Sequence, residues 1–224
     1  MEFSAGMIEL NMMKTSNNVD VALTYKKYYI DRDYEQIDLF QLIKQTYKVK
    51  KAIYPGSYIH ISPSFIYPEV VYIDSDKNAK KFFNSEELIP FINNRKEYSE
   101  DSKIKYFGID YKKQIDELIN GYDLLISQYA GFISDTCKEY LKIGGILLVN
   151  NSHGDAGLAS IDEDYKFISV VHKSGGKYRL SQTSLEKYFI PKREMIVTRE
   201  MLFKSGKGVG YTKTAPLYIF QRIC

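Results

Sequence analysis

The chain has 224 residues, of which 44% are hydrophobic and 26% charged, an ordinary composition for a globular protein with one sizeable core. Its formal net charge of +3 is too small to indicate nucleic-acid binding by itself, because acidic residues are interspersed with the lysines. The two cysteines, Cys137 and Cys224, give neither a metal-ligand spacing nor a disulfide framework, which fits a reducing cytoplasm.

The N-terminal stretch "MEFSAGMIELNMMKTSNN" has no basic start and no unbroken apolar centre, so it does not have the pattern of a signal peptide. No apolar run approaches the roughly 20 residues that span a bilayer. We therefore expect no membrane partner. Residues 1–32 are predicted to form a partly disordered arm, and residues 33–224 a single domain.

The first predicted element is a helix over residues 33–48, where Ile37, Phe40, Ile43 and Tyr47 recur at helical spacing. A short strand, "KAIYPG", follows and stops at a Pro-Gly turn. The stretch "SPSFIYP" predicts a short helix with Ser62 as its cap. "VVYIDSD" then reads as a β-branched strand that ends on acids, and residues 76–83 and 85–98 are predicted to be helical.

The middle of the chain repeats this alternation. "KIKYFGID" predicts a third strand, residues 111–120 a helix closed by Gly121, "YDLLIS" a fourth strand, residues 131–143 a helix and "GGILLVNN" a fifth strand. "YKFISVVHKSGGKYRLSQ" predicts a hairpin around Gly-Gly, and "APLYIFQRI" a final strand. The expected fold class is α/β, a doubly wound and mostly parallel sheet with antiparallel edge strands.

Polar residues stand where these strands end, and ligands of doubly wound sheets bind at that edge. Gly56 permits a close backbone approach after the first strand. The carboxylate of Asp74 can accept from both hydroxyls of a ribose, and that of Asp110 from the exocyclic amine of adenine. Because no GKS or GKT sequence follows the glycine, the pattern favours an adenosine without a polyphosphate.

The stretch "YDLLISQYAGFISDTCKEYLKIGGILLVNN" resembles the S-adenosylmethionine-dependent methyltransferases of the Rossmann-like class. Asp123, Leu141, Lys142, Gly144 and Gly145 stand where that class has a strand of the type "fDlv", then a helix and "L(K)xGGxLlv". The resemblance implies S-adenosylmethionine as the cofactor and a small-molecule or unknown methyl acceptor. The cofactor-binding residues that it implies are Tyr54, Pro55, Gly56, Ser57, Asp74, Ser75, Asp110, Ser127, Gln128 and Tyr129.

The chain departs from that class in its first loop, which offers the single Gly56 in place of a GxGxG pattern. Plainer readings also stay open. Gly56 could simply end a strand, Asp110 could cap the helix that follows it, and Asp74 could do the same for its own helix. For that last role Asp76 is also available, so we favour a ligand contact for Asp74.

The loop "NNSHGDAG", residues 150–157, is the predicted place for chemistry. His153 is the candidate catalytic residue, because an imidazole can take a proton from an acceptor. Asp155, two positions later, could orient it. The plainer reading is that His153 makes a hydrogen bond within a tight turn. Nothing in the sequence predicts a metal site.

The function that these patterns favour is methyl transfer from S-adenosylmethionine to an unidentified acceptor. The alternatives are a non-catalytic Rossmann-like protein that acts through partners, and another adenosine-cofactor enzyme such as an aminopropyl transferase. The residues after the fourth strand, 127–130, lack the prolines of the tetrad used to methylate base amines, which argues against a nucleic-acid substrate. "SGKGVG" is expected to be a loop, and the lysines of "TYKKYYIDRDY" the solvent face of a helix.

Overall fold

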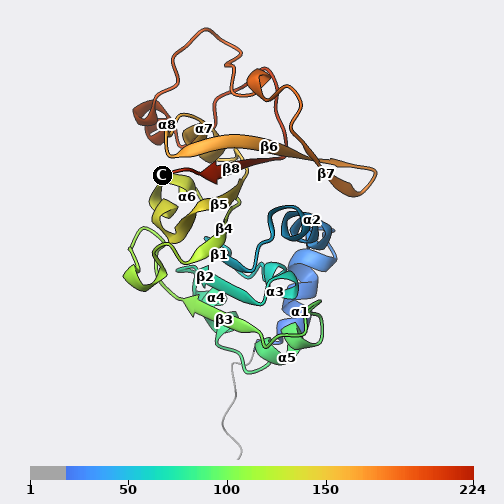
Figure 1. The fold of residues 1–224 in the computed structure, drawn as a ribbon. Coiled ribbons are helices and arrows are strands. Elements are labelled where there is room, and N and C mark those ends of the chain that lie inside the picture. The colour runs from blue at the N-terminus through green and yellow to red at the C-terminus, as the bar shows by residue number, and fades with distance from the viewer. Residues whose placement is uncertain (1–18) are drawn as a thin grey trace, which may run out of the picture.

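Residues 19–224 are described by a computed structural model, and within this range eight strands form one sheet (Figure 1). The strands follow the spatial order β3-β2-β1-β4-β5-β8-β6-β7. Their bounds are Lys51–Pro55 (β1), Glu69–Ile73 (β2), Lys103–Phe107 (β3), Tyr122–Ser127 (β4), Leu141–Val149 (β5), Tyr165–Ser174 (β6), Lys177–Ser181 (β7) and Leu217–Arg222 (β8).

The first five strands are parallel to one another, whereas β8 pairs antiparallel with both β5 and β6, and β7 antiparallel with β6. The predicted doubly wound sheet and its hairpin are therefore confirmed. The final strand lies inside the sheet, between β5 and β6, and not at its edge. Chain order reverses where β1 meets β4, which is the place where such sheets open a crevice at their carboxyl ends.

Helices cover both faces of the sheet, with α1, α2, α3 and α5 on one side and α6 and α7 on the other (Figure 1). In β4, Leu124 and Ile126 face the first layer and Leu125 the second, as the two-residue repeat of a strand requires. The helix bounds are Val21–Tyr25 (α1), Ile37–Tyr47 (α2), Pro63–Ile66 (α3), Lys77–Phe83 (α4), Leu88–Asn93 (α5), Ile133–Thr136 (α6), Asp155–Ser160 (α7) and Arg199–Ser205 (α8).

The described part of the N-terminal arm is helical. Asp20 caps α1 by accepting from the Leu23 amide at 2.8 Å, and the chain continues as a π-helical segment, Lys26–Ile30. Tyr25 and Tyr29 are buried, whereas Lys26 is exposed, as expected for a helix with a solvent-facing lysine side. Residues 1–18 of the predicted arm lie outside the described residues.

Four predicted helices, over residues 33–48, 85–98, 111–120 and 131–143, are longer than the helices observed, and α5 spans only Leu88–Asn93. The first helix begins at Ile37 and not at residue 33, because Asp33 and Gln36 adopt left-handed conformations with φ of 51° and 62°. The helix predicted over 111–120 is wrong apart from one 3-10 turn, Asp116–Leu118. A helix would need the Ile115 amide for its own backbone, but this amide donates to the Tyr140 hydroxyl at 2.9 Å. That partner lies 25 residues away in the chain.

The helix predicted over 131–143 is also shorter than expected. It contains α6 and a 3-10 turn, Lys138–Tyr140, and β5 has already begun at Leu141. Ser62 precedes α3 but makes no side-chain cap, because its hydroxyl is 2.5 Å from the Tyr25 hydroxyl of α1. At Ser62 a side-chain contact distant in the chain replaces the predicted cap, and at Leu141 pairing with Tyr122 of β4 begins the strand where a helix was predicted.

The carboxyl ends of β1 and β4 meet at Gly56. Gly56 has φ of +65°, and its amide donates to Ile73 at the end of β2 at 2.7 Å. A Cβ atom at this position would lie 2.1 Å from the Cβ of Ala130, which follows β4. The close approach that only a glycine allows is therefore made by the protein's own chain.

Gly56→Ala should lower the free energy of unfolding by about 2–4 kcal/mol, since it adds overpacking to the cost of a left-handed alanine. In an Ala130→Gly background only the backbone part, about 1–2 kcal/mol, should remain. Gly175→Ala is the matched control, because Gly175 has φ of +57° and open space around its Cβ position. Urea unfolding is measured for the parent, the two single variants, the double variant and the control. An equal cost in both backgrounds would show that the Gly56–Ala130 contact is not the constraint.

Candidate functional site

The candidate site is formed where β4 and β5 end, on the side of the sheet that α2 covers. Ser127 pairs with Val149 in the parallel ladder, so the next residues, Gln128 and Asn150, are also neighbours. The side chains of both point toward the α2 side, because strand residues alternate between faces. Gln128 is 3% exposed and Asn150 6% exposed.

The orientation of the Asn150 amide is determined by its neighbours. Its Oδ1 accepts from the Ser152 hydroxyl at 2.9 Å, from the Ser152 amide at 3.3 Å and, at 3.5 Å, from the Tyr129 amide. Its Nδ2 is buried and has no hydrogen-bond partner in residues 19–224. Leaving a buried donor without a partner costs about 1–3 kcal/mol, which is a reason to look for a ligand.

Gln128 presents a second free donor. Its Oε1 accepts from the Tyr34 hydroxyl at 3.0 Å, and its Nε2 is buried without a partner among the described residues. Tyr34 comes from the turn before α2, and its ring lies 6.3 Å from that of Tyr129. Tyr129 is 63% exposed and has φ of +60°, so its side chain is held outward. Two amide donors and two tyrosines thus share one place.

Neither Tyr34 nor Asn150 was among the cofactor-binding residues that the sequence implied. Asn150 could have been found, because it directly follows the fifth strand. Tyr34 had no local signal, since its partner Gln128 lies 94 residues further along the chain.

Asp74 lies at the end of β2, as predicted, and joins two loops. Its Oδ2 accepts from the Tyr58 amide at 2.7 Å and its Oδ1 from the Asp76 amide at 2.8 Å. Asp76 caps α4 by accepting from the amides of Asn78 and Ala79, so Asp74 is not needed as that cap. The Asp74 carboxylate is partly exposed, and each of its oxygens keeps further capacity to accept.

The other predicted cofactor-binding residues are spread around the same edge of the sheet. Asp110 is exposed and closes a turn by accepting from the Lys112 amide at 2.9 Å, so it does not cap a helix. Ser75 is exposed and Ser57 is buried. The predicted residues whose side chains turn into the protein are Tyr54, with its hydroxyl 3.3 Å from His60 Nδ1, and Pro55.

His153 and Asp155 do not form a pair. The His153 Nδ1 lies 3.0 Å from the Ser152 hydroxyl. The Asp155 carboxylate is buried and turned to the other side, where it accepts from the hydroxyls of Ser127 and Ser134 at 2.5 Å each. The expectation that Asp155 orients His153 is therefore wrong. His153 remains half-buried in the loop beside Asn150.

The polar groups at this edge fit the polar parts of S-adenosylmethionine. The carboxylates of Asp74 and Asp110 offer acceptors after β2 and β3, and the free amide donors of Gln128 and Asn150 stand after β4 and β5. The space beside Gly56 is the exception, because Ala130 already fills it. In residues 19–224 no group of three or more histidine, cysteine or acidic residues could hold a metal ion.

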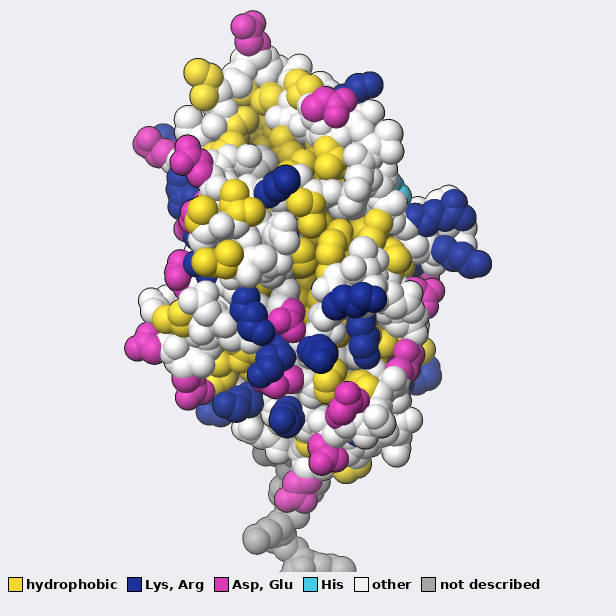
Figure 2. Space-filling view, viewed as in Figure 1, with side chains coloured by type: hydrophobic (Ala, Val, Ile, Leu, Met, Phe, Trp, Pro, Cys, Tyr) yellow, Lys and Arg dark blue, Asp and Glu magenta, His cyan; other side chains and the backbone are white. Residues whose placement is uncertain are grey.

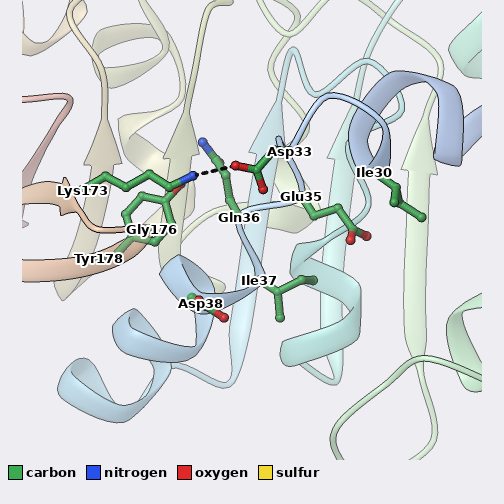
Figure 3. A pocket seen from close by; sticks show the side chains of 9 residues that line it. All are labelled: Ile30, Asp33, Glu35, Gln36, Ile37, Asp38, Lys173, Gly176 and Tyr178. Atoms are coloured by element: carbon green, nitrogen blue, oxygen red, sulfur yellow. Dashed lines mark hydrogen bonds and ion pairs between the residues drawn. The ribbon is translucent and has the colours of Figure 1, made fainter.

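A separate polar pocket of about 190 Å³ lies between the turn before α2 and the β6–β7 hairpin (Figure 3). Lys173 of the hairpin reaches Asp33 across it at 3.4 Å, and Gln36 and Tyr178 face it from the two sides. This volume is below the roughly 300 Å³ at which small-molecule pockets begin. We therefore interpret the pocket as a gap where the turn before α2 packs on the β6–β7 hairpin, and not as a ligand site.

No helix within residues 19–224 is long and apolar enough to cross a membrane.

No known family pattern and no curated protein matches the chain. Solved structures do. One is a candidate S-adenosyl-L-methionine-dependent methyltransferase from Methanococcus maripaludis, at 15% identity and a TM-score of 0.41, covering 58% of this chain. This chain spans 60% of that protein's length.

Two further matches are O-methyltransferases. TomG from Streptomyces achromogenes, in complex with S-adenosylmethionine, matches at 11% identity and a TM-score of 0.46, over 72% of this chain and 87% of its own. The enzyme from Bacillus cereus, in complex with S-adenosylhomocysteine, matches at 12% identity and a TM-score of 0.45, over 65% and 77%. These proteins are of the class that the sequence resembles.

Asp155 and His60 should change stability in opposite directions over the same pH range. Burial raises the pKa of Asp155 from 3.8 to about 6, and burial lowers the pKa of His60 from 6.5 to about 4. Between these values the folded state binds more protons than the unfolded chain at Asp155 and fewer at His60. The free energy of unfolding therefore falls with pH through Asp155 and rises with pH through His60.

Asp155→Asn should remove the opposing effect of Asp155 and leave only the pH dependence that comes from His60. The free energy of unfolding should then rise by up to about 3 kcal/mol from pH 4 to 6.5. His60→Gln should instead show a fall of similar size between pH 4 and 6. Urea unfolding across this range tests both, with His172→Gln as the control. A profile for Asp155→Asn that matches the parent would contradict a raised pKa at Asp155.

Proposed function

We propose that the chain binds S-adenosylmethionine and transfers its methyl group to an oxygen atom of an acceptor. The observation that carries the proposal is the pair of buried amide donors, Gln128 Nε2 and Asn150 Nδ2, which have no partner in residues 19–224. They stand after β4 and β5, at the edge of the sheet where Asp74 follows β2.

The strand ends on one side of this edge suit the nucleoside of the cofactor, and those on the other side suit the reacting methyl group and the acceptor. Asp74 and Asp110 would hold the nucleoside, the first through the ribose hydroxyls and the second through the adenine amine. The reacting end then belongs near β4 and β5. When bound, S-adenosylmethionine supplies a methyl group on a positively charged sulfur that needs little further activation, so catalysis is largely alignment of the acceptor.

The residues after β4 and β5 supply what an oxygen acceptor requires. A hydroxyl group becomes a good nucleophile as it loses its proton, and His153 would take that proton at one of its ring nitrogens. The negative charge left on the oxygen would be stabilised by the amide donors of Gln128 and Asn150, which have no protein partner within residues 19–224. The exposed ring of Tyr129 would cover a planar acceptor.

The close contact between Gly56 and Ala130 favours a second candidate, a non-catalytic protein of the same fold. In that case the crevice between β1 and β4 stays closed and the surface acts through partners. Calorimetry with S-adenosylmethionine and S-adenosylhomocysteine separates the two candidates. Absence of binding of both ligands at millimolar concentration would favour the non-catalytic protein.

Asp74→Asn should weaken S-adenosylmethionine binding roughly ten- to a hundredfold, since it removes a charged acceptor of the ribose hydroxyls. The asparagine keeps one oxygen for the loop contacts, so the variant should fold, which circular dichroism checks. Asp76→Ala is the control and should change affinity less than twofold, because its side chain serves the cap of α4. Parent-like affinity in a folded Asp74→Asn protein would remove Asp74 from the cofactor site.

His153→Ala should lower the turnover number by about 10²–10⁴ and leave cofactor affinity nearly unchanged, as expected for loss of a general base. Turnover is measured by transfer of a labelled methyl group to an acceptor found by screening hydroxylated compounds. His172→Ala serves as the control, because His172 lies on β6 with its Nε2 3.2 Å from the Tyr188 hydroxyl. Full turnover of His153→Ala at neutral pH would show that the loop shapes the site without taking the proton.

A further inference from the structure

The long connection between β7 and β8 carries an unusual charge and an unusual surface. Residues 190–214 contain six Lys or Arg and two Glu, a net charge of +4 against +3 for the whole chain. The same segment exposes large apolar side chains, among them Met195 (43% exposed), Ile196 (86%) and Phe203 (44%). Figure 2 shows hydrophobic side chains gathered on the upper part of the molecule, where Figure 1 places this connection.

A pocket of about 410 Å³ lies within this segment. We call it the 192–210 pocket. Three apolar residues, Met195, Met201 and Val209, line it together with three basic residues, Lys192, Arg193 and Lys207. The rest of the lining is Ser205, Gly208 and Gly210. The volume is in the range of small-molecule sites, near its lower limit.

The pocket walls are held by backbone contacts. The Lys192 amide donates to the Gly210 carbonyl and the Thr212 amide to the Ile190 carbonyl, both at 2.8 Å. Between them, Tyr211 is buried, with its ring 5.2 Å from that of Phe189. The helix α8, which contributes Met201, is capped at its start by Thr198. The pocket is therefore part of the fold, although it lies in a connection between strands.

The pocket adjoins the candidate site. A Cβ atom on Gly154 would lie 3.0 Å from the Lys207 carbonyl, and one on Gly208 would lie 2.7 Å from the Asn151 carbonyl. The wall of the pocket thus packs directly on the loop after β5 that carries His153.

The chemistry of the lining selects the ligand. None of the residues that line the pocket is acidic, and Lys192, Arg193 and Lys207 form no ion pair within residues 19–224. By contrast, Arg199 on the neighbouring helix pairs with Asp135. Unpaired cations beside an apolar wall favour a ligand with an apolar body and a carboxylate, because the carboxylate gains charge-assisted hydrogen bonds there. Methionines adapt to apolar bodies of different shape.

We propose that the 192–210 pocket binds the apolar, carboxylate-bearing part of the methyl acceptor, so that the acceptor is a hydroxylated acid with an aromatic or short aliphatic body. That the ligand is the methyl acceptor rests on the proposed methyl transfer. The binding itself needs no cofactor.

The test is calorimetric binding of 2-naphthoate to the full chain without S-adenosylmethionine. 2-Naphthamide, of nearly the same shape but uncharged, should bind the parent at least tenfold more weakly. Exchange of both Arg193 and Lys207 for glutamine should weaken naphthoate binding roughly tenfold or more, by loss of charged hydrogen bonds, and leave naphthamide unchanged. Met201→Ala should weaken both ligands.

Lys204→Gln is the matched control, because Lys204 is an exposed cation on α8 that does not line the pocket. It should change naphthoate affinity less than twofold. Equal effects of Lys204→Gln and the double variant would show general charge attraction and overturn the proposal. So would equal binding of naphthoate and naphthamide, or binding only to vesicles of anionic lipid. Circular dichroism confirms that each variant is folded.

The outcomes separate this proposal from the function on which it rests. Naphthoate binding with no binding of S-adenosylmethionine would leave the pocket assigned and reject methyl transfer. Binding of S-adenosylmethionine with no naphthoate binding would reject the pocket and leave methyl transfer in place.

Discussion

The buried carboxylate of Asp155 is the contact on which the candidate site depends. It is the first residue of α7, and it accepts from Ser127 at the end of β4 and from both the amide and the hydroxyl of Ser134 in α6. One side chain therefore joins the segments that follow β4 and β5. Gln128 and Asn150 directly follow these two strands, and the β4–β5 ladder makes them neighbours. Burial without a positively charged partner explains why the pKa of Asp155 is raised.

The other side of the site is built from the N-terminal part of the chain. The π-helical segment and the turn before α2 bring Tyr29 and Tyr34 over the carboxyl ends of β1 and β4. Tyr29 stacks on the buried His60 with ring centres 4.6 Å apart, and Tyr34 bonds to Gln128. Tyr29 and Tyr34 thus pack beside these strand ends, whereas α1 packs against α5.

The sequence was sufficient to predict most strands and the edge at which the polar residues gather. Runs such as "VVYIDSD" are apolar because both faces of a parallel strand are buried, and this burial leaves a pattern that can be read directly. Asp76 as the cap of α4 could also be predicted, because a helix cap is a local contact, whereas the ligand contact of Asp74 stays a prediction. Helices failed where a partner distant in the chain took a backbone group, as Tyr140 does with the Ile115 amide.

The same distinction applies to the site. Gly56 was predicted as a place where a ligand approaches closely, but the atom that lies there belongs to Ala130, 74 positions further on, and no local pattern records such a contact. Tyr34 was missed for this reason as well. The sequence predicts which residues lie at the carboxyl edge of the sheet, because they directly follow strands. It does not predict which of them contact one another, because that depends on loops brought together by the fold.

The position of β8 between β5 and β6 has a consequence for the order of folding. Strands β6 and β7 leave the ribosome before β8 and can pair with each other as a hairpin, but they reach the sheet only through β8. Until residues 217–222 have been made, β5 presents an open edge of unpaired backbone groups, the kind of edge that recruits strands from other chains. The 192–210 pocket lies in the connection that leads to β8. Its completion therefore coincides with closure of the sheet, late in synthesis, after the first five strands can already have come together.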